Sequence, residues 1–350
     1  MSSKSSNVWF LPWGKRSQLS DLLSAAGLPA FFKKDEFVAI KAHFGEKGND
    51  GYIKPKFFKP IITLAVEART RPFLTDTNTI YHGERNNTIG HLATAHGHGF
   101  SIERLGIPIV IADGLQGENY EEIKVDGRHF EKVKIARTII EADTIIAVSH
   151  FKGHLMAGFG GAIKNIGMGC GARRGKFEMH STVAPTISLK NCTGCGACIK
   201  ICSHGALKIV DKKVQLDNAK CAGCGECIIT CGHDALRITW SESWKNVQEK
   251  FAEYACGAVQ GKKLFCITFV NHITPNCDCV SMGEEPLTAD IGILASQDPV
   301  AIDQAALDLV LKSAGHDVFK KAHPHIDHNA QLVHAEKMNL GSRKYGLISV

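Results

Sequence analysis

The chain has 350 residues, of which 44% are hydrophobic and 22% charged. This balance is typical of a folded protein with a sizeable core, and it excludes disorder as the main state. No apolar run approaches the roughly 18–20 residues that span a bilayer. The formal net charge is +6, and the sequence contains no run of five or more basic residues. We therefore expect a cytoplasmic protein with neither a membrane nor a nucleic-acid partner.

Apolar runs alternate with amphipathic stretches along most of the chain. This pattern predicts an α/β fold with a mostly parallel sheet, because parallel strands are covered on both faces. Strands are expected at 37–42, 72–75, 107–112, 144–149, 264–270 and 291–295. Helices are expected at 56–69, 89–97, 243–258, 299–313 and 329–338. A hairpin is expected at 121–133, turning at Asp126 and Gly127.

Two cysteine runs with the spacing C-x2-C-x2-C-x3-C interrupt this pattern. The spacing is typical of two-cluster ferredoxins, in which the fourth cysteine of each run binds the other cluster. One predicted [4Fe–4S] cluster has the ligands Cys192, Cys195, Cys198 and Cys231. The other has the ligands Cys202, Cys221, Cys224 and Cys227. Zinc is the alternative, but zinc ribbons use two separated C-x2-C pairs.

These runs define a small segment between two larger parts of the chain. We expect an α+β, bacterial-ferredoxin-like 2[4Fe–4S] module at 187–240. It would be inserted in an α/β body that comprises residues 1–186 and 241–350. The alternative is three independent domains, but the last part has few strands of its own.

Polar residues collect where five of the predicted strands end. They are His43, Asp76, Asp113, His150 and Asp298. Ligands of open α/β sheets bind outside the carboxyl ends of the strands. We therefore expect a pocket at this edge.

Four residues near this edge are the candidates to bind an anionic substrate or to donate protons, namely His43, Lys152, His154 and Lys164. Two further histidines, His82 and His180, are expected nearby. The segment 152–176 interleaves eight glycines with five cations. Glycines let backbone N–H groups approach an anion, so this segment is either an anion site or a flexible surface loop.

Cys277 and Cys279 flank one aspartate in a loop after a predicted strand. Two thiols at this spacing suit a third metal ion or a redox pair. Two free surface thiols are the alternative. Cys256 and Cys266 lie in an apolar helix and an apolar strand, so we expect both to be inert.

Short motifs run along the whole chain, at 41–46, 152–154, 158–165, 167–169, 179–180, 277–279 and 290–303. Their combination resembles the family called domain of unknown function 362, in its version with a ferredoxin module. The resemblance implies an iron–sulfur protein and no settled reaction. It marks as motif positions, without roles, Lys152, His154, Lys164, Asn165, Cys277 and Cys279.

The leading hypothesis is an iron–sulfur oxidoreductase. Two [4Fe–4S] clusters would relay electrons between a soluble donor or acceptor protein and a substrate or metal pocket in the α/β body. A carrier alone would not need so large a body. The alternative is an iron–sulfur carrier or maturation factor without its own turnover. A flavin or nucleotide enzyme that uses the glycine-rich segment is the third hypothesis.

Overall fold

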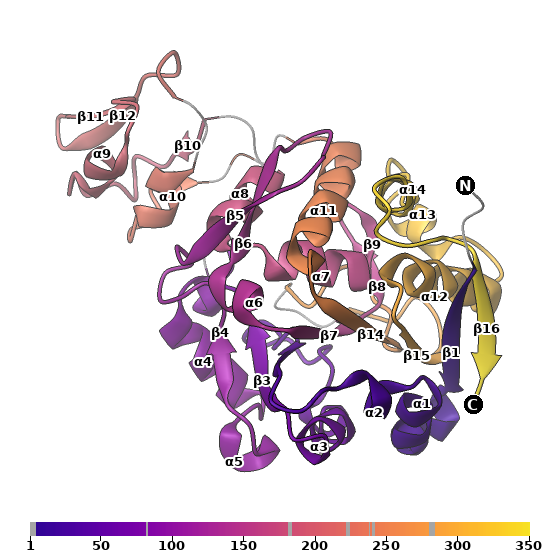
Figure 1. Cartoon of the computed structure of the whole chain (residues 1–350). Coiled ribbons are helices and arrows are strands. Elements are labelled where there is room, and N and C mark those ends of the chain that lie inside the picture. The colour runs from indigo at the N-terminus through magenta and orange to yellow at the C-terminus, as the bar shows by residue number, and fades with distance from the viewer. Residues whose placement is uncertain are drawn as a thin grey trace.

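The computed structural model describes residues 5–81, 83–180, 184–221, 225–237, 239, 242–279 and 284–350. An eight-stranded sheet forms the centre of the molecule, in the order β16-β1-β15-β14-β7-β2-β3-β4 (Figure 1). Its strands are β1 (Ser6–Pro12), β2 (Phe37–Lys41), β3 (Arg71–Asp76), β4 (Ile109–Ile111), β7 (Thr144–His150), β14 (Lys263–Val270), β15 (Gly292–Ser296) and β16 (Tyr345–Ser349). Neighbouring strands pair in parallel, except that β15 is antiparallel to both β1 and β14.

The sheet joins strands from both sides of the cysteine-rich segment. β14 pairs with β7 from Lys263 opposite Thr144 to Phe269 opposite His150. β1 and β15, which lie far apart in the sequence, are also neighbours. The α/β body is therefore one sheet built from residues before and after 187–240.

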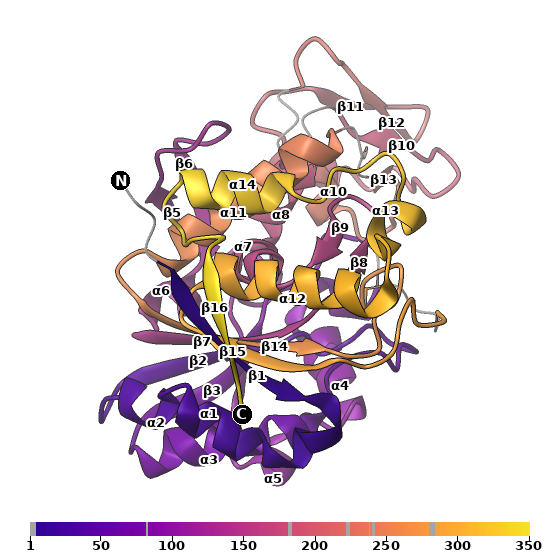
Figure 2. The same ribbon diagram turned by 90° about the vertical axis from the view of Figure 1, so that its right-hand side faces the viewer.

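Helices cover both faces of this sheet (Figure 2). One layer contains α1 (Leu19–Ala25), α2 (Leu28–Phe31), α3 (Lys59–Glu67) and α5 (Ile102–Leu105), with α4 (Thr88–Gly97) beside β4. The other contains α6 (Arg137–Glu141), α7 (Ala162–Cys170), α8 (Arg173–His180), α11 (Trp244–Val259), α12 (Pro299–Ala314), α13 (Val318–Ala322) and α14 (Ala330–Lys337). Short 3-10 helices occur at Trp13–Gln18, Pro55–Phe57 and Glu84–Asn86. This arrangement confirms the expected α/β body with a mostly parallel sheet.

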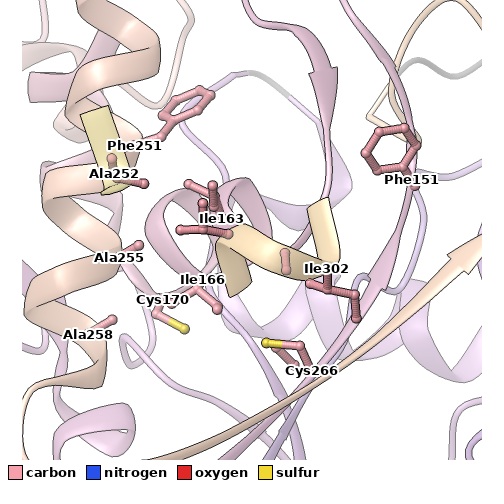
Figure 3. Close-up of a cluster of buried hydrophobic side chains, with 14 of the residues drawn as sticks. Phe151, Ile163, Ile166, Cys170, Phe251, Ala252, Ala255, Ala258, Cys266 and Ile302 are labelled. Atoms are coloured by element: carbon pink, nitrogen blue, oxygen red, sulfur yellow. The ribbon is translucent and has the colours of Figure 1, made fainter. Parts of the chain in front are cut away.

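A hydrophobic core lies on the side of the sheet that α7 and α11 cover, and these two helices pack together there (Figure 3). Ile163 and Ile166 of α7 meet Phe251 and Ala255 of α11, and all four side chains are fully buried. The helices approach closely because a Cβ atom at Gly167 would lie 2.1 Å from the Phe251 carbonyl oxygen. Only glycine fits at this crossing.

The cysteine-rich segment forms a small lobe that projects from the body (Figure 1). It contains β10 (Thr186–Ile187), α9 (Ala197–Ile201), β11 (Leu207–Val210), β12 (Lys213–Leu216), α10 (Glu226–Thr230) and β13 (Leu236–Arg237). Its two halves repeat in structure as well as in sequence. Helices α9 and α10 follow Gly196 and Gly225, whose φ angles are +76° and +75°. These left-handed angles favour glycine, which explains the repeated glycine in each run.

The six predicted strands of the sheet are present, with ends within two residues of those expected, and so are the five predicted helices. The sequence analysis missed β1 and β16, which pair with each other at one edge of the sheet. The glycine-rich segment is not a flexible loop. It forms the hairpin strands β8 (Lys152–His154) and β9 (Gly158–Gly160) and most of α7 and α8.

The expected tight turn at Asp126 and Gly127 is wrong. The hairpin strands are β5 (Tyr120–Lys124) and β6 (Lys132–Ala136), so the connection is wider. The physical reason is Glu253 of α11, whose buried carboxylate accepts the backbone N–H groups of residues 128, 129 and 130. These bonds hold the connection open against the helix.

No helix in the described part of the chain is long and apolar enough to cross a membrane.

Replacing Glu253 with Ala is expected to destabilise the body by about 3 kcal/mol, because three backbone donors and His334 lose a buried acceptor. Chemical denaturation measures this loss. Glu122→Gln in the same hairpin is the control, since its exposed ion pair with Lys132 contributes about 0.5 kcal/mol or less. Equal losses in the two variants would contradict the assignment.

Candidate functional site

The order of the parallel strands reverses between β2 and β7. The chain passes from β2 outward to β3 and β4, then returns to β7 on the other side of β2. Loops diverge at such a switch point, and this is where open α/β sheets bind ligands. A pocket of about 470 Å³ lies at the carboxyl ends of these strands.

This pocket brings together the six residues predicted to bind substrate, donate protons or form the third metal or thiol site. Those that line it are His43, Lys152, His154, Lys164, Cys277 and Cys279. His150 and His180 line it as well, whereas His82 lies outside the described residues. Their catalytic or metal-binding roles stay predictions.

Two of the five strand-end residues expected at the pocket do not line it. Asp298 follows β15, which runs antiparallel, so its strand end lies at the opposite edge of the sheet. Its carboxylate instead caps α12 by accepting the N–H groups of Val300 and Ala301. Asp113 is fully buried beside the pocket and accepts the backbone N–H groups of Asn78 and Arg173.

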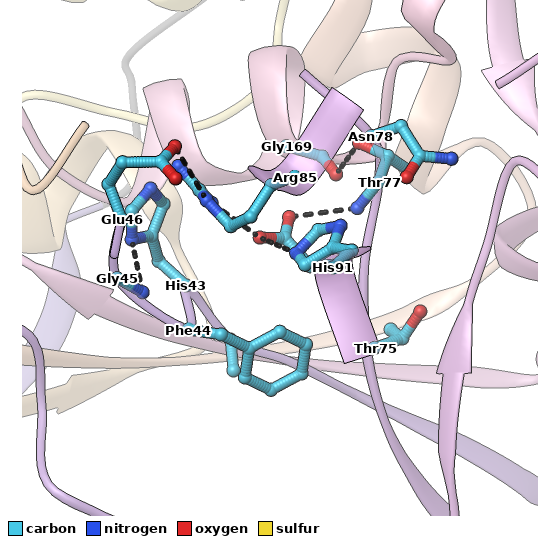
Figure 4. Close-up of polar contacts among 12 residues, drawn as sticks. His43, Phe44, Gly45, Glu46, Thr75, Thr77, Asn78, Arg85, His91 and Gly169 are labelled. Carbon is cyan, nitrogen blue, oxygen red and sulfur yellow. Dashed lines mark hydrogen bonds and ion pairs between the residues drawn. The ribbon is translucent and has the colours of Figure 1, made fainter. Parts of the chain in front are cut away.

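A buried ion network forms one wall of the pocket (Figure 4). The Asp76 carboxylate lies 2.9 Å from Lys41 Nζ and 3.5 Å from Arg85 Nη1. Arg85 Nε also donates to Glu46 at 3.2 Å. Burial opposes ionisation of Asp76, but Lys41 and the neighbouring imidazoles outweigh it and hold the pKa of this carboxyl well below its usual value. Burial lowers the pKa of the adjacent His91 to about 4, so His91 is neutral.

The pocket carries an excess of positive charge. Five cationic side chains line it against two carboxylates, Asp76 and Asp278; the cations are Lys41, Arg85, Lys152, Lys164 and Lys176. Lys164 has no ion pair or hydrogen bond to another described residue, although it is only partly exposed. Burial lowers the pKa of Lys152 to about 7, which suits proton transfer near neutral pH. The site is suited to an anionic ligand.

The loop with Cys277 and Cys279 is fixed to the body through the residue between them. Asp278 is buried and forms an ion pair with Lys152. Its carbonyl oxygen also accepts the Glu46 N–H at 3.2 Å. Cys277 and Cys279 interact, so that each thiol shifts the pKa of the other. Among described residues no three His, Cys, Asp or Glu side chains are grouped to hold a metal ion. The third metal ion and the redox pair both stay predictions for these two thiols.

Sequence reasoning missed Tyr81 and Arg85. Both line the pocket, and Arg85 Nη2 donates to Tyr81 Oη at 2.6 Å. They belong to a polar connection between β3 and α4 that has no motif or periodicity of its own. The only signal was the polar end of the preceding strand at Asp76.

In the projecting lobe, four predicted ligands of the first cluster line one small cavity: Cys192, Cys195, Cys198 and Cys231. Backbone N–H groups point at two of these sulfurs, from Val214 and Ala235, each at 3.3 Å. For the second cluster, Cys202, Cys221 and Cys227 are described, while Cys224 lies outside the described residues. A cubane cluster spreads its thiolates farther apart than a single ion does, so the lack of a one-ion site within the described ranges does not test the clusters.

The lobe contacts the wall of the pocket. A Cβ atom at Gly225 would lie 2.5 Å from the Phe177 ring of α8, the helix that also provides Lys176 and His180 to the pocket. A second cavity, of about 640 Å³, lies between the lobe and the body. Cys231 lines it from one side, and Tyr81 lines both this cavity and the pocket.

An open, mostly parallel sheet with a pocket at its switch point defines an α/β protein with a candidate ligand site at the strand ends. The chain belongs to the family described as domain of unknown function (DUF362), whose model matches residues 38–308. This match confirms the family resemblance drawn from the motifs. Among curated proteins, none matches the chain.

Two solved structures are distantly similar. The lactate racemase apoprotein from Thermoanaerobacterium thermosaccharolyticum is 14% identical with a TM-score of 0.38, over 76% of this chain and 51% of that one. A protein from Thermotoga maritima is 10% identical with a TM-score of 0.39, over 86% of this chain and 57% of that one. The chain thus spans little more than half the length of either protein.

Replacing Asp76 with Asn is expected to destabilise the body by about 3–5 kcal/mol, because Lys41 and Arg85 remain buried without their shared carboxylate. The lowered pKa means that this stabilisation is present at neutral pH and is lost as the pH falls below about 4. Denaturation at several pH values measures both effects.

Asp35→Asn is the matched control. Asp35 is exposed, its ion pairs are long, and asparagine tolerates its positive φ of 66°. A loss for Asp76→Asn no larger than for this control would contradict the role given to the network.

Proposed function

We propose that the protein is an iron–sulfur oxidoreductase. Electrons pass through two [4Fe–4S] clusters in the lobe at 187–240, and an anionic small molecule is converted in the pocket of the α/β body. A soluble electron donor or acceptor protein is the partner at the lobe.

The observation that carries this proposal is the convergence of Cys192, Cys195, Cys198 and Cys231 on one cavity. Three cysteines come from one run and the fourth from the other, which is the ligand pattern of two-cluster ferredoxins. The N–H groups of Val214 and Ala235 supply the hydrogen bonds to sulfur that tune such clusters. The repeated glycines before α9 and α10 support a second site of the same kind.

Contact between the lobe and the pocket wall supports electron transfer between them. Gly225, beside the second predicted cluster, packs on Phe177 of α8. Ile80 and Tyr81 line both the cavity beside Cys231 and the pocket beside Cys279. When bound, the clusters would supply electrons one at a time.

The pocket residues would bind and protonate the substrate. Lys164 provides a positive charge with no carboxylate partner among the described residues, and it acts electrostatically on His154 and Cys279. Lys152, with its lowered pKa, is the proton donor that this arrangement favours. An iron–sulfur carrier remains the alternative proposal, which the exposed position of Cys195 supports.

Protein purified without oxygen is expected to contain about eight iron atoms and eight sulfides per chain, four of each for every [4Fe–4S] cluster. Elemental analysis and EPR after dithionite reduction measure this. Cys192→Ser is expected to halve the iron and the EPR signal. Cys256→Ser, outside both runs, is the control and should change neither. Zinc without labile sulfide would contradict the proposal.

A second measurement separates the enzyme from the carrier. The dithionite-reduced protein is mixed with small anionic oxidants, and reoxidation is followed by the visible absorbance of the clusters. An enzyme is expected to be reoxidised repeatedly while its iron content stays constant, with Lys164→Gln slower than the parent. Transfer of iron and sulfide to an apo-ferredoxin without turnover would favour the carrier.

A further inference from the structure

The sulfur of Cys279 has polar neighbours in the pocket. His43 Nε2 lies 3.4 Å from it, and Tyr81 and Cys277 interact with it electrostatically. Cys279 is a partly exposed residue that lines the pocket, unlike the fully buried Cys170 and Cys266. A sulfur that has several donors around it and stays accessible has the environment of a reactive thiolate.

The direction of the His43 bond follows from its other ring nitrogen. Gly45 donates its backbone N–H to His43 Nδ1 at 3.1 Å (Figure 4). Nδ1 is therefore the acceptor, and the ring proton lies on Nε2, from which it points at Cys279. Burial lowers the pKa of His43 to about 4, so the ring is neutral and acts as a hydrogen-bond donor to the sulfur.

The orientation of the Tyr81 hydroxyl follows in the same way. Arg85 donates from Nη2 to Tyr81 Oη at 2.6 Å, so the hydroxyl proton is free to point at Cys279. Arg85 in turn is held by Glu46 and Asp76. The buried ion network thus orients a neutral donor toward the sulfur.

Cys277 completes the arrangement. Its side chain is the largest influence on Cys279 and lowers the pKa of that thiol well below its usual value, against the opposing effect of burial. The pKa of Cys277 is raised well above its usual value, so it keeps its proton. Asp278, between the two cysteines, pairs with Lys152, so its carboxylate is held apart from the interaction between the two thiols.

We propose that Cys279 is a nucleophilic thiolate and Cys277 its resolving thiol, and that the pair reduces a small anionic disulfide bound near Lys164. The electron source in this inference rests on the proposed function, whereas the reactivity of the two thiols does not.

The reaction balances in three steps. Cys279 attacks one sulfur of the substrate disulfide, the S–S bond breaks, and the first thiolate leaves. Cys277 gives its proton to that thiolate and attacks the Cys279 sulfur, which releases the second thiolate and leaves a Cys277–Cys279 disulfide. Two electrons, supplied one at a time by the reduced donor protein through the lobe, and one proton from solvent then restore the Cys279 thiolate and the Cys277 thiol.

The test uses 5,5′-dithiobis(2-nitrobenzoate), an anionic aromatic disulfide that releases a coloured thiolate. The oxygen-free holoprotein, in a Cys256→Ser background, is expected to release two equivalents in a fast phase and retain no adduct. Peptide mass spectrometry should then find a Cys277–Cys279 disulfide. Cys277→Ser should release one equivalent and retain the adduct on Cys279. Cys279→Ser should lose the fast phase.

Two further variants test whether the reactivity of Cys279 depends on the neighbouring pocket residues or only on the exposure of its thiol. Tyr81→Phe is expected to slow the fast phase about tenfold, the effect of removing one hydrogen bond to a charged sulfur. Lys164→Gln is expected to slow it about tenfold with the anionic probe and little with neutral 4,4′-dithiodipyridine. Circular dichroism verifies that each variant is folded.

A fast phase that maps to any cysteine other than Cys279 overturns the inference. So does a rate that is unchanged in folded Tyr81→Phe and Lys164→Gln. The outcome for the proposed function is separate. Fast release from a protein without iron would support the thiol pair and contradict the electron relay. Two intact clusters together with an unreactive Cys279 would support the relay and contradict the thiol pair.

Discussion

The pocket depends on one buried carboxylate. Asp76, at the end of β3, holds Lys41 from the end of β2 and Arg85 from the connection that follows. Lys41 also donates to Asn165 of α7 at 2.9 Å, so the network links both sides of the switch point. Charges this deeply buried are tolerated only as a complete set, because each alone would carry a large desolvation cost. The walls of the pocket are therefore fixed relative to one another before any ligand arrives.

The same network connects structure to chemistry. Arg85 satisfies the oxygen of Tyr81, and this leaves the phenolic proton for Cys279. Gly153 makes a second connection. A Cβ atom there would lie 2.0 Å from the Pro275 carbonyl oxygen, so a glycine lets β8 run against the loop that carries Cys277 and Cys279. The sequence analysis left two roles open for the glycines of this segment, an anion site or a flexible surface loop. At Gly153 and Gly167 they allow close contact between backbones instead.

Much of the fold was predictable because buried parallel strands are continuous apolar runs. The pocket edge was predictable too, since polar residues follow those runs at His43, Asp76 and His150. The antiparallel direction of β15 was not predictable, because an apolar run has the same pattern whether the strand is parallel or antiparallel to its neighbours. The terminal strands were missed because they mix polar and apolar residues and pair only with distant partners. Tyr81 and Arg85 were missed for a related reason: they reach the site through the fold and carry no local pattern.

The position of β1 has a consequence for how the chain matures on the ribosome. Its partners in the sheet are β15 and β16, so the strand at 6–12 has no hydrogen-bonded neighbour until residue 292 and beyond have been made. An unpaired strand edge is prone to wrong association, and non-local pairing is slow. Both cysteine runs emerge long before that pairing closes. A chaperone that shields the early strand would therefore protect the nascent chain until the sheet closes.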